Sequence, residues 1–245
     1  MAALEILIIV TSHEQAGSSG QKTGIWLEEL AVPYYFFKEV GAVVTLASVQ
    51  GGAVPVDPKS ESIIASNSTI KRFQKDSAAM GMLLKSTHVS LQKAGDFDLV
   101  LVLGGHGAIW DFYSDVPLKK LLEDFNGQYK PIGAIGQGVT AFLQMVDRSG
   151  NPFVKGRLLT ASSNSEEKAY RLTVAVPLQL ETELISLGAS YSKKANFENH
   201  TVTDQNIVTG QNAASAKEVA EKLLICRKNY PAKFKVSSEM LPYNS

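Results

Sequence analysis

The sequence is poor in the features that mark secreted, membrane-bound or nucleic-acid-binding proteins. It has one cysteine, Cys226, so no internal disulfide can form, and we expect a reducing, cytoplasmic location. Its 24 basic and 24 acidic residues balance, and no run of like charge stands out. A basic face for nucleic acid or for an anionic membrane is therefore not expected.

Long hydrophobic runs are absent as well. The apolar segment 4–10 is interrupted by Glu5, lacks a basic leader and is too short to cross a bilayer, so we predict a buried strand rather than a targeting or membrane segment. Two matches to the N-glycosylation pattern, at Asn67 and Asn199, carry little weight without a secretion signal.

What the sequence does contain, over 245 residues, is an alternation of short β-branched runs with longer amphipathic stretches. This pattern predicts an α/β fold in one domain, with a central mainly parallel sheet covered by helices on both faces. We expect the domain to span residues 1–230, with a helical insertion at about 58–95 and a tail at 231–245. The expected strands are 4–11, 43–48, 99–103, 132–135, 158–160 and 207–209, and the expected helices are 26–40, 118–126, 139–146, 178–187 and 213–226.

Candidate functional residues follow the expected strands, because ligands of open α/β sheets bind beyond the carboxyl ends of the strands. Ser12, His13 and Glu14 follow the first strand, and glycine-rich tips at 104–111 and 136–138 follow the third and fourth. Such tips indicate either the close approach of backbone to a small molecule or tight turns alone.

Residues 136–141 also match G-x-G-x-x-A, the dinucleotide-binding fingerprint, directly after an expected strand. The fingerprint belongs in the first βαβ unit and needs an acid at the tip of the next strand, where this sequence has Ala161, Ser162 and Ser163. We therefore expect no nicotinamide cofactor, and no other cofactor or metal.

Several segments resemble the Hsp31-like branch of the DJ-1/PfpI superfamily, from about Ile6 to Leu224 and with their spacing kept. The similar segments are 22–35, 46–48, 51–52, 57–60, 104–111 and 208–212. The resemblance implies a flavodoxin-like three-layer sandwich, usually a homodimer, with a cysteine nucleophile on a sharp strand-to-helix elbow. The activities that it implies are those of a glyoxalase III, a deglycase, a peptidase or a chaperone.

The elbow of this sequence departs from the family pattern. Where the family reads Ala-x-Cys-His-Gly, residues 134–138 place Gly136 at the nucleophile and Gln137 at the histidine. Glycine has no side chain that can attack a substrate, and an amide does not transfer protons usefully near neutral pH. Glycine does adopt the positive φ of such an elbow without strain. A similar glycine elbow occurs in the amidotransferase-like, Parkinson-disease-7-domain branch, which is considered non-catalytic or uncharacterised.

The rest of the family pocket is expected to remain. Glu29 aligns with the acid that hydrogen-bonds the cysteine in the family, the alternative being a solvated helix residue. His106 either lines the pocket or caps its own glycine turn, and Trp110 either lines the pocket or lies in the core. The backbone N–H groups of Gly107 and Gln137 would form the remnant of an oxyanion hole. The expected pocket residues are Glu29, Gly105, His106, Gly107, Trp110, Gly136 and Gln137, with Asp111, His13 and Glu14 as further candidates.

Three functions remain open. The first is a non-catalytic pseudoenzyme that binds a small metabolite, an anion or a protein partner at the old pocket. The second is a residual hydrolase or lyase of the glyoxalase III or deglycase type, in which Glu29 activates a water in the space of the missing thiol. The third is a holdase or scaffold. We expect the first, because Gln137 removes the second proton-transfer group as well.

Overall fold

The computed structural model describes residues 3–62, 67–147, 149–171 and 176–229, and is built on a seven-stranded sheet. The strand order is β3-β2-β1-β4-β5-β9-β8. The strands are β1 (Glu5–Val10), β2 (Val43–Ser48), β3 (Thr87–His88), β4 (Leu99–Val102), β5 (Ile132–Ile135), β8 (Thr201–Asp204) and β9 (Ile207–Gly210). All neighbouring pairs are parallel except β8 with β9, so the predicted mainly parallel sheet is confirmed.

Strand β1 shows how the sequence builds a core on each face of the sheet. Its Ile6, Ile8 and Val10 pack into one core, whereas Leu7 and Ile9 pack into the other. All five side chains are fully buried, because successive residues of a strand point to opposite faces and helices cover both. The chain is therefore a three-layer α/β sandwich of the flavodoxin-like kind.

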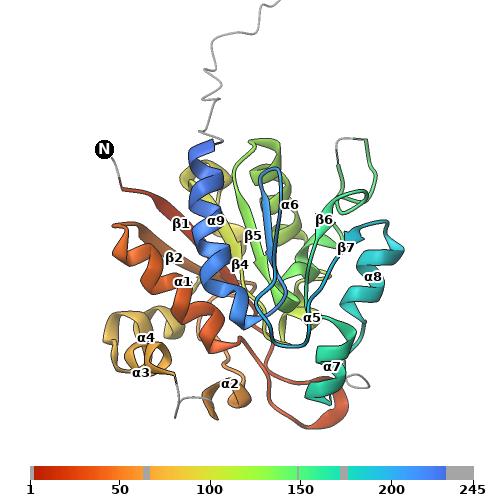
Figure 1. Cartoon of the computed structure of the whole chain (residues 1–245). Helices are drawn as coiled ribbons and strands as arrows, with labels where there is room; N and C mark the ends of the chain where they lie inside the picture. Colours follow the sequence, from red (N-terminus) through yellow and green to blue (C-terminus); the bar gives the residue numbers. More distant parts are fainter. Residues whose placement is uncertain (1–2, 63–66, 148, 172–175, 230–245) are drawn as a thin grey trace, which may run out of the picture.

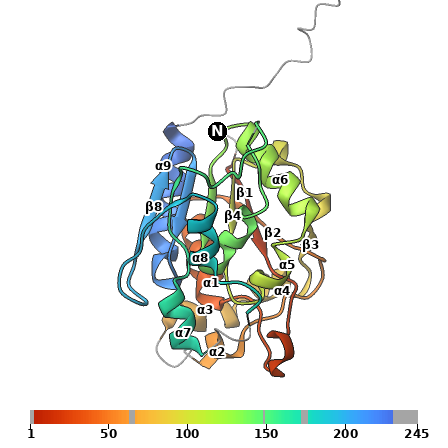
Figure 2. The same ribbon diagram turned by 90° about the vertical axis from the view of Figure 1, so that its right-hand side faces the viewer.

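Helices on the two faces follow the predicted pattern. The helices α1 (Leu27–Glu39) and α9 (Ala216–Asn229) pack side by side on one face, and α6 (Val116–Gly127) covers the other (Figures 1 and 2). The helix α8 (Leu180–Ser186) matches the expected helix at 178–187, and α7 (Asn164–Tyr170) precedes it. The predicted helices at 26–40, 118–126, 178–187 and 213–226 are thus confirmed with shifted ends.

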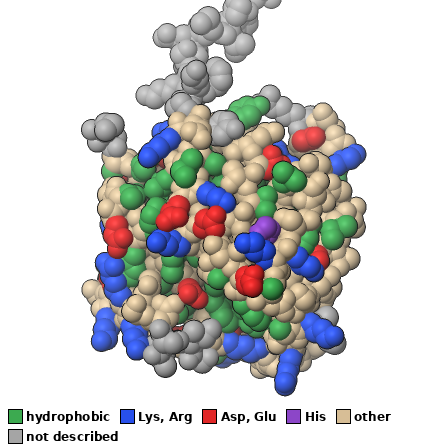
Figure 3. Space-filling view, viewed as in Figure 1, with side chains coloured by type: hydrophobic (Ala, Val, Ile, Leu, Met, Phe, Trp, Pro, Cys, Tyr) green, Lys and Arg blue, Asp and Glu red, His purple; other side chains and the backbone are tan. Residues whose placement is uncertain are grey.

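The surface that carries α1 and α9 has acidic and basic side chains mixed over it (Figure 3). On α9, Lys222 Nζ lies 2.8 Å from Glu218 Oε1, one turn away. Exposed pairs of this kind contribute only about 0.3–0.5 kcal/mol each, so the stability of the fold comes mainly from its two cores. Within the described ranges, no helix combines the length and apolar character that a bilayer crossing needs.

The segment 158–160, predicted as a strand of the main sheet, lies elsewhere. It forms β6 (Leu158–Leu159), which pairs with β7 (Ser190–Tyr191) in a separate two-stranded sheet. The position beside β9 is taken by β8, since only Gln205 and Asn206 separate these two strands and they pair as a hairpin. A hairpin brings its strands together with little loss of chain entropy, so it occupies the sheet edge.

The helix predicted at 139–146 also differs from the structure, in its bounds and in its type. The chain leaves β5 directly into η5 (Gly136–Phe142), a 3-10 helix whose seven residues are all buried. A 3-10 helix is narrower than an α-helix and is used in short pieces. It lets the chain turn sharply at Gly136 while packing against α5 (Ala108–Asp111) and the ends of β4 and β9.

The described part of the expected helical insertion contains the short helices α2 (Pro58–Ser62), α3 (Ser68–Lys75) and α4 (Ser77–Leu84). Helix α3 packs on α1 and contributes Ile70 and Phe73 to their shared core. Asn67 caps α3, since its side chain accepts from the backbone N–H groups of Thr69 and Ile70. The insertion therefore extends the α1 layer. The predicted tail at 231–245 lies outside the described residues.

The strand order reverses beside β1, which lies between β2 and β4. Ligands of open α/β sheets bind at the carboxyl ends of the strands near this point. The tip of β4 and the elbow after β5 are in close backbone contact there. A Cβ added at Gly104 would lie 2.7 Å from the Ile135 carbonyl oxygen and 2.9 Å from the Gln137 nitrogen, so only glycine fits.

Gly105 provides a test of this packing. Its φ is +97°, and an added Cβ would lie 2.2 Å from the Gly24 carbonyl oxygen. We predict that Gly105→Ala lowers the free energy of unfolding by at least about 2 kcal/mol in urea denaturation. As a control, Gly81→Ala in α4 meets no atom within 4 Å and should raise it by about 0.5–1 kcal/mol. Similar effects of the two changes would contradict the packing described for the β4 tip.

Candidate functional site

The elbow after β5 is built around Gly136. Its φ is +52°, in the left-handed region that glycine adopts freely, as predicted from the elbow pattern. A Cβ built at this position would lie 3.2 Å from Glu29 Oε1 and 3.8 Å from the Gln211 carbonyl oxygen. A side chain at position 136 would therefore point at the carboxyl of Glu29, and glycine leaves that space open.

Glu29 comes from the first turn of α1 and is only 3% exposed. Its Oε2 accepts a hydrogen bond of 2.7 Å from the Gly104 N–H. Burial raises the pKa of Glu29 to about 8, because the hydrogen bond from Gly104 does not offset the loss of solvent and the charges of Glu28 and Glu166 oppose ionisation further. At neutral pH Glu29 is mainly protonated, and it becomes a base above pH 8.

Gln137 is held in a buried polar network beside the elbow. Its Nε2 donates to Glu167 Oε1 at 2.7 Å and to Ser162 Oγ at 3.1 Å, and its Oε1 accepts from the Gly105 N–H at 3.4 Å. The Gln137 side chain is thus committed to structural hydrogen bonds.

His106 belongs to the same network. Its Nε2 lies 2.9 Å from Glu167 Oε2, and both side chains are 2% exposed. Burial opposes the charge on Glu167, but the hydrogen bonds and charge of His106, with bonds from Gln137 and Ser162, bring its pKa below the ordinary value. The site therefore keeps a buried imidazole–carboxylate pair, although the elbow itself contributes no histidine.

A cavity of about 20 Å³ lies between these groups. A cavity holds a water when it offers roughly 10–15 Å³ and polar partners, so this one has room for about one water beside Glu29. Its lining residues are Trp26, Glu29, His106, Gly136, Gln137, Ser162, Glu166, Tyr170, Asn212 and Ala213. An outer recess of about 340 Å³ adjoins it and shares Trp26, Tyr170, Asn212 and Ala213.

Four of the seven expected pocket residues, Glu29, His106, Gly136 and Gln137, line this cavity, and three do not. Gly105 packs against the backbone of residues 24–26, and Gly107 packs against Thr11 and the His13 carbonyl. Trp110 stacks on the His13 ring with the ring centroids 5.2 Å apart.

The tip of β1 is pinned by Asp111 rather than turned into the cavity. Asp111 accepts hydrogen bonds from Thr11 Oγ1 and from the Ser12 N–H at 2.7 Å, and burial raises its pKa to about 6. His13 Nε2 lies 2.6 Å from the carbonyl oxygen of Gln15 and is not among the cavity residues. Glu14 is exposed.

Helix α7 and the residues it brings to the cavity were not expected from the sequence. Helix α7 starts with a capping box, in which the Ser163 and Glu166 side chains each bond the other's backbone N–H. The pattern S-x-x-E directly after a strand-like segment was the available signal. It would have placed Glu166, Glu167 and Tyr170 on one helix, although not beside the elbow.

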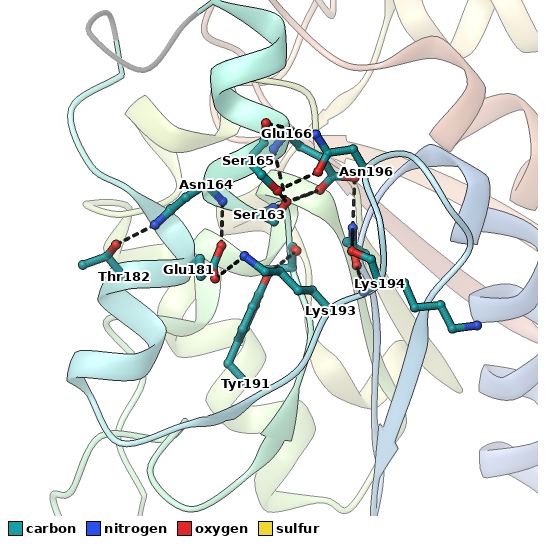
Figure 4. Close-up of polar contacts among 12 residues, drawn as sticks. Ser163, Asn164, Ser165, Glu166, Glu181, Thr182, Tyr191, Lys193, Lys194 and Asn196 are labelled. Atoms are coloured by element: carbon teal, nitrogen blue, oxygen red, sulfur yellow. Dashed lines mark hydrogen bonds and ion pairs between the residues drawn. The ribbon is translucent and has the colours of Figure 1, made fainter.

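Glu166 also anchors the loop before β8. Its Oε1 accepts from the Phe197 N–H at 2.9 Å and from the side-chain amides of Gln211 and Asn212. Figure 4 shows α7 and the 193–196 segment facing each other across this carboxylate, with Asn196 bonded to Ser165. The 193–198 loop is therefore fixed against α7 and forms a wall of the site.

The charged groups of the site do not resemble a metal centre. Among the described residues, no group of three or more histidine, cysteine, aspartate or glutamate side chains is arranged to hold a metal ion. The carboxylates of Glu166 and Glu167 are already saturated by protein donors.

The fold and the elbow define the class of this protein. Residues 23–225 match the sequence profile of the DJ-1/PfpI family, and the chain belongs to that family.

Similar proteins cover nearly the whole chain. It is 26% identical to "Glyoxalase 3" of Candida albicans, over 90% of this chain and 97% of that protein. It is 24% identical to "Glutathione-independent glyoxalase HSP31" of Saccharomyces cerevisiae, over 94% of this chain and 100% of that protein. Among solved structures, Rapid Encystment Protein 24 KDa of Francisella tularensis superposes with a TM-score of 0.87 and 31% identity, over 91% of this chain and 99% of that one. The similarity thus extends beyond the elbow to the complete fold.

The buried carboxyl predicts a pH-dependent stability. The pKa of Glu29 lies near 8 in the folded protein, above its ordinary value, so stability falls as pH rises between these two values and stays low above pH 8. Glu29→Gln removes this loss and keeps an acceptor for Gly104. We expect the variant to match the wild type near pH 5 and to be more stable at pH 9, by on the order of 4 kcal/mol in denaturant titrations. A difference independent of pH would contradict the raised pKa.

Restoring a thiol tests whether the elbow still faces Glu29. In a Cys226→Ser background, Gly136→Cys should give a thiol that titrates below the ordinary ~8.5, because protonated Glu29 can donate a hydrogen bond to the thiolate. The native Cys226 is the opposite case, since burial raises its pKa. Iodoacetamide alkylation against pH measures both thiols, and adding Glu29→Ala should raise the pKa of the introduced thiol again. A pKa of the introduced thiol that is the same with Glu29 and with Glu29→Ala would show that the two groups do not interact.

Proposed function

We propose that this protein converts small α-oxoaldehydes to 2-hydroxy acids without a thiol, using Glu29 as the base. The observation that carries the proposal is the open space at Gly136, which faces Glu29 at 3.2 Å from the missing Cβ and adjoins a cavity for about one water. The similarity to proteins named as glyoxalases in Candida albicans and Saccharomyces cerevisiae supports this enzymatic function over a purely non-catalytic one.

The chemistry requires a hydrated substrate rather than a covalent thiol adduct. Water adds to the aldehyde carbon to give a gem-diol, and one of its hydroxyls takes the place of the missing sulfur. The Glu29 carboxylate removes the proton from that carbon, which leaves an enediolate, and the proton returns to the neighbouring carbon. The aldehyde carbon is oxidised and the ketone carbon reduced, so the sum is oxoaldehyde plus water to hydroxy acid, with no external oxidant.

The surroundings of Glu29 suit this role. A carboxylate with a pKa near 8 is a much stronger base than an ordinary one, as in other enzymes that bury a catalytic carboxyl. The backbone N–H of Gln137, expected from the elbow pattern to be part of an oxyanion hole, and the His106 ring are the proposed groups that stabilise the enediolate. The Glu167 carboxylate orients His106 from behind.

A second candidate is a non-catalytic binder of the same carbonyl compounds. It is favoured by Gln137, whose amide cannot transfer a proton and whose hydrogen bonds hold it in the network with Glu167 and Ser162. In that case the pocket binds the hydrate and does not isomerise it.

Conversion of methylglyoxal to lactate separates the two candidates. We expect slow turnover in the wild type, the same rate in Cys226→Ser, and a loss of at least about a hundredfold in Glu29→Gln. The value of kcat/KM should rise with pH and level off above about 8, since the ionised form of Glu29 is the base. Wild-type turnover no faster than the reaction without enzyme would favour the non-catalytic alternative, and equal turnover of wild type and Glu29→Gln above that level would reject Glu29 as the base.

A further inference from the structure

The outer recess beside the elbow has an aromatic lining. Its volume of about 340 Å³ falls within the range of small-molecule sites, roughly 300–1,000 Å³. Because it shares Trp26, Tyr170, Asn212 and Ala213 with the inner cavity, a molecule with its carbonyl at the elbow would extend into the recess. The remaining lining residues are Glu28, Phe197 and Ala214.

Three rings from distant parts of the chain form one wall of the recess. Trp26 and Tyr170 meet edge to face with ring centroids 5.6 Å apart, and Tyr170 meets Phe197 in the same way at 5.3 Å. Edge-to-face contacts of this kind hold rings in fixed positions. The wall is thus ordered before any ligand arrives.

Phe197 is held in an unfavourable conformation. Its φ is +64°, a region that bulky residues rarely adopt, and its side chain is 46% exposed. The conformation is imposed by the bond from the Phe197 N–H to the buried carboxylate of Glu166, and by the bonds between Asn196 and Ser165 (Figure 4). Strained residues that the surroundings hold in place are typical of ligand-binding sites.

The charges near the recess limit the ligand to a molecule without negative charge. Glu28 lies at the recess, half-buried and bonded to the Asn67 side chain, and Glu29 and Glu166 line the cavity below. An anionic group, such as the carboxylate of a 2-oxo acid, would be opposed by the acidic side chain of Glu28 at the recess and by that of Glu166 at the cavity, whereas the protonated Glu29 adds no charge at neutral pH. The polar end of the ligand is expected at the elbow and its apolar end between the rings.

We propose that the recess bounded by Trp26, Tyr170 and Phe197 binds an aryl or similarly bulky apolar substituent, so that the site selects neutral aryl-substituted carbonyl compounds over small alkyl ones. This inference rests on the proposed function for the placement of the carbonyl at the elbow, and it names the class of substrate. Phe197 is the specificity-determining residue, since it is the exposed ring of the wall.

The test uses unreactive ketones, which bind but have no aldehyde to isomerise. Acetophenone and acetone share a methyl ketone and differ by the phenyl ring. The protein has two tryptophans, so a ¹⁵N-labelled sample gives two indole N–H signals, which Trp110→Phe assigns. Titration of each ketone, followed by the Trp26 signal, gives both the affinity and the place of binding, and Trp110 serves as an internal reference outside the recess.

We expect acetophenone to bind at least about tenfold more tightly than acetone, with a shift of Trp26 and not of Trp110. Phe197→Ala should weaken acetophenone binding by about three- to tenfold and leave the affinity for acetone unchanged. Phe197→Leu keeps an apolar side chain of similar bulk, so it should weaken acetophenone binding less than Phe197→Ala does. The matched control is Tyr129→Ala, which removes another exposed ring at positive φ, 54°, outside the recess.

Equal affinities for the two ketones, or equal effects of Phe197→Ala and Tyr129→Ala, would overturn the inference. The outcome is independent of catalysis. Acetophenone bound at Trp26 without turnover of either methylglyoxal or phenylglyoxal would support the recess and reject the proposed function. Turnover without selective acetophenone binding would support the proposed function and reject the recess as an aryl-binding site.

Discussion

The hydrogen bond from the Gly104 N–H to Glu29 joins the first turn of α1 to the tip of β4 and sets the carboxyl beside the elbow after β5. The bond requires glycine at 104, because a Cβ there would lie 2.9 Å from Glu29 Oε2 and still closer to the Ile135 carbonyl. Close backbone contact between the two strand tips buries the carboxyl. Burial in turn keeps it neutral at physiological pH, so the packing of the sheet end determines the chemistry of the site.

Buried carboxyl groups around the cavity differ in what surrounds them. Glu167 accepts from His106, Gln137 and Ser162, and these donors lower its pKa despite burial. Glu166 accepts hydrogen bonds from backbone and side-chain amide groups and holds the loop before β8 in place. Glu29 accepts a hydrogen bond from the Gly104 N–H, which does not offset the loss of solvent, so its pKa is raised. The donors around Glu167 thus lower its pKa, whereas Glu29, whose pKa is raised, can exchange a proton near neutral pH.

Positive φ is used in two opposite ways at this site. At Gly136 the residue has no side chain, so the elbow is free of strain and the space beside Glu29 stays open. At Phe197 a bulky residue is forced into the same region by Glu166, and its ring is placed at the rim of the outer recess. The pocket therefore does not depend on a side chain at position 136, because its walls are fixed by a separate network.

Much of this protein follows from its sequence. Apolar runs such as 132–135 and 207–210 are strands because short runs rich in β-branched residues suit a sheet that is covered on both faces. The positions of Gly136 and Gln137 directly after a strand are likewise visible in the sequence. Other features depend on which segments meet. Leu158 and Leu159 leave the main sheet because the β8–β9 hairpin occupies its edge. The pairing of His106 with Glu167, the burial of Glu29 and the recess of Trp26, Tyr170 and Phe197 join residues far apart in the chain. Only tertiary packing decides them, because desolvation and side-chain contact depend on neighbours in space, which the order of residues along the chain does not contain.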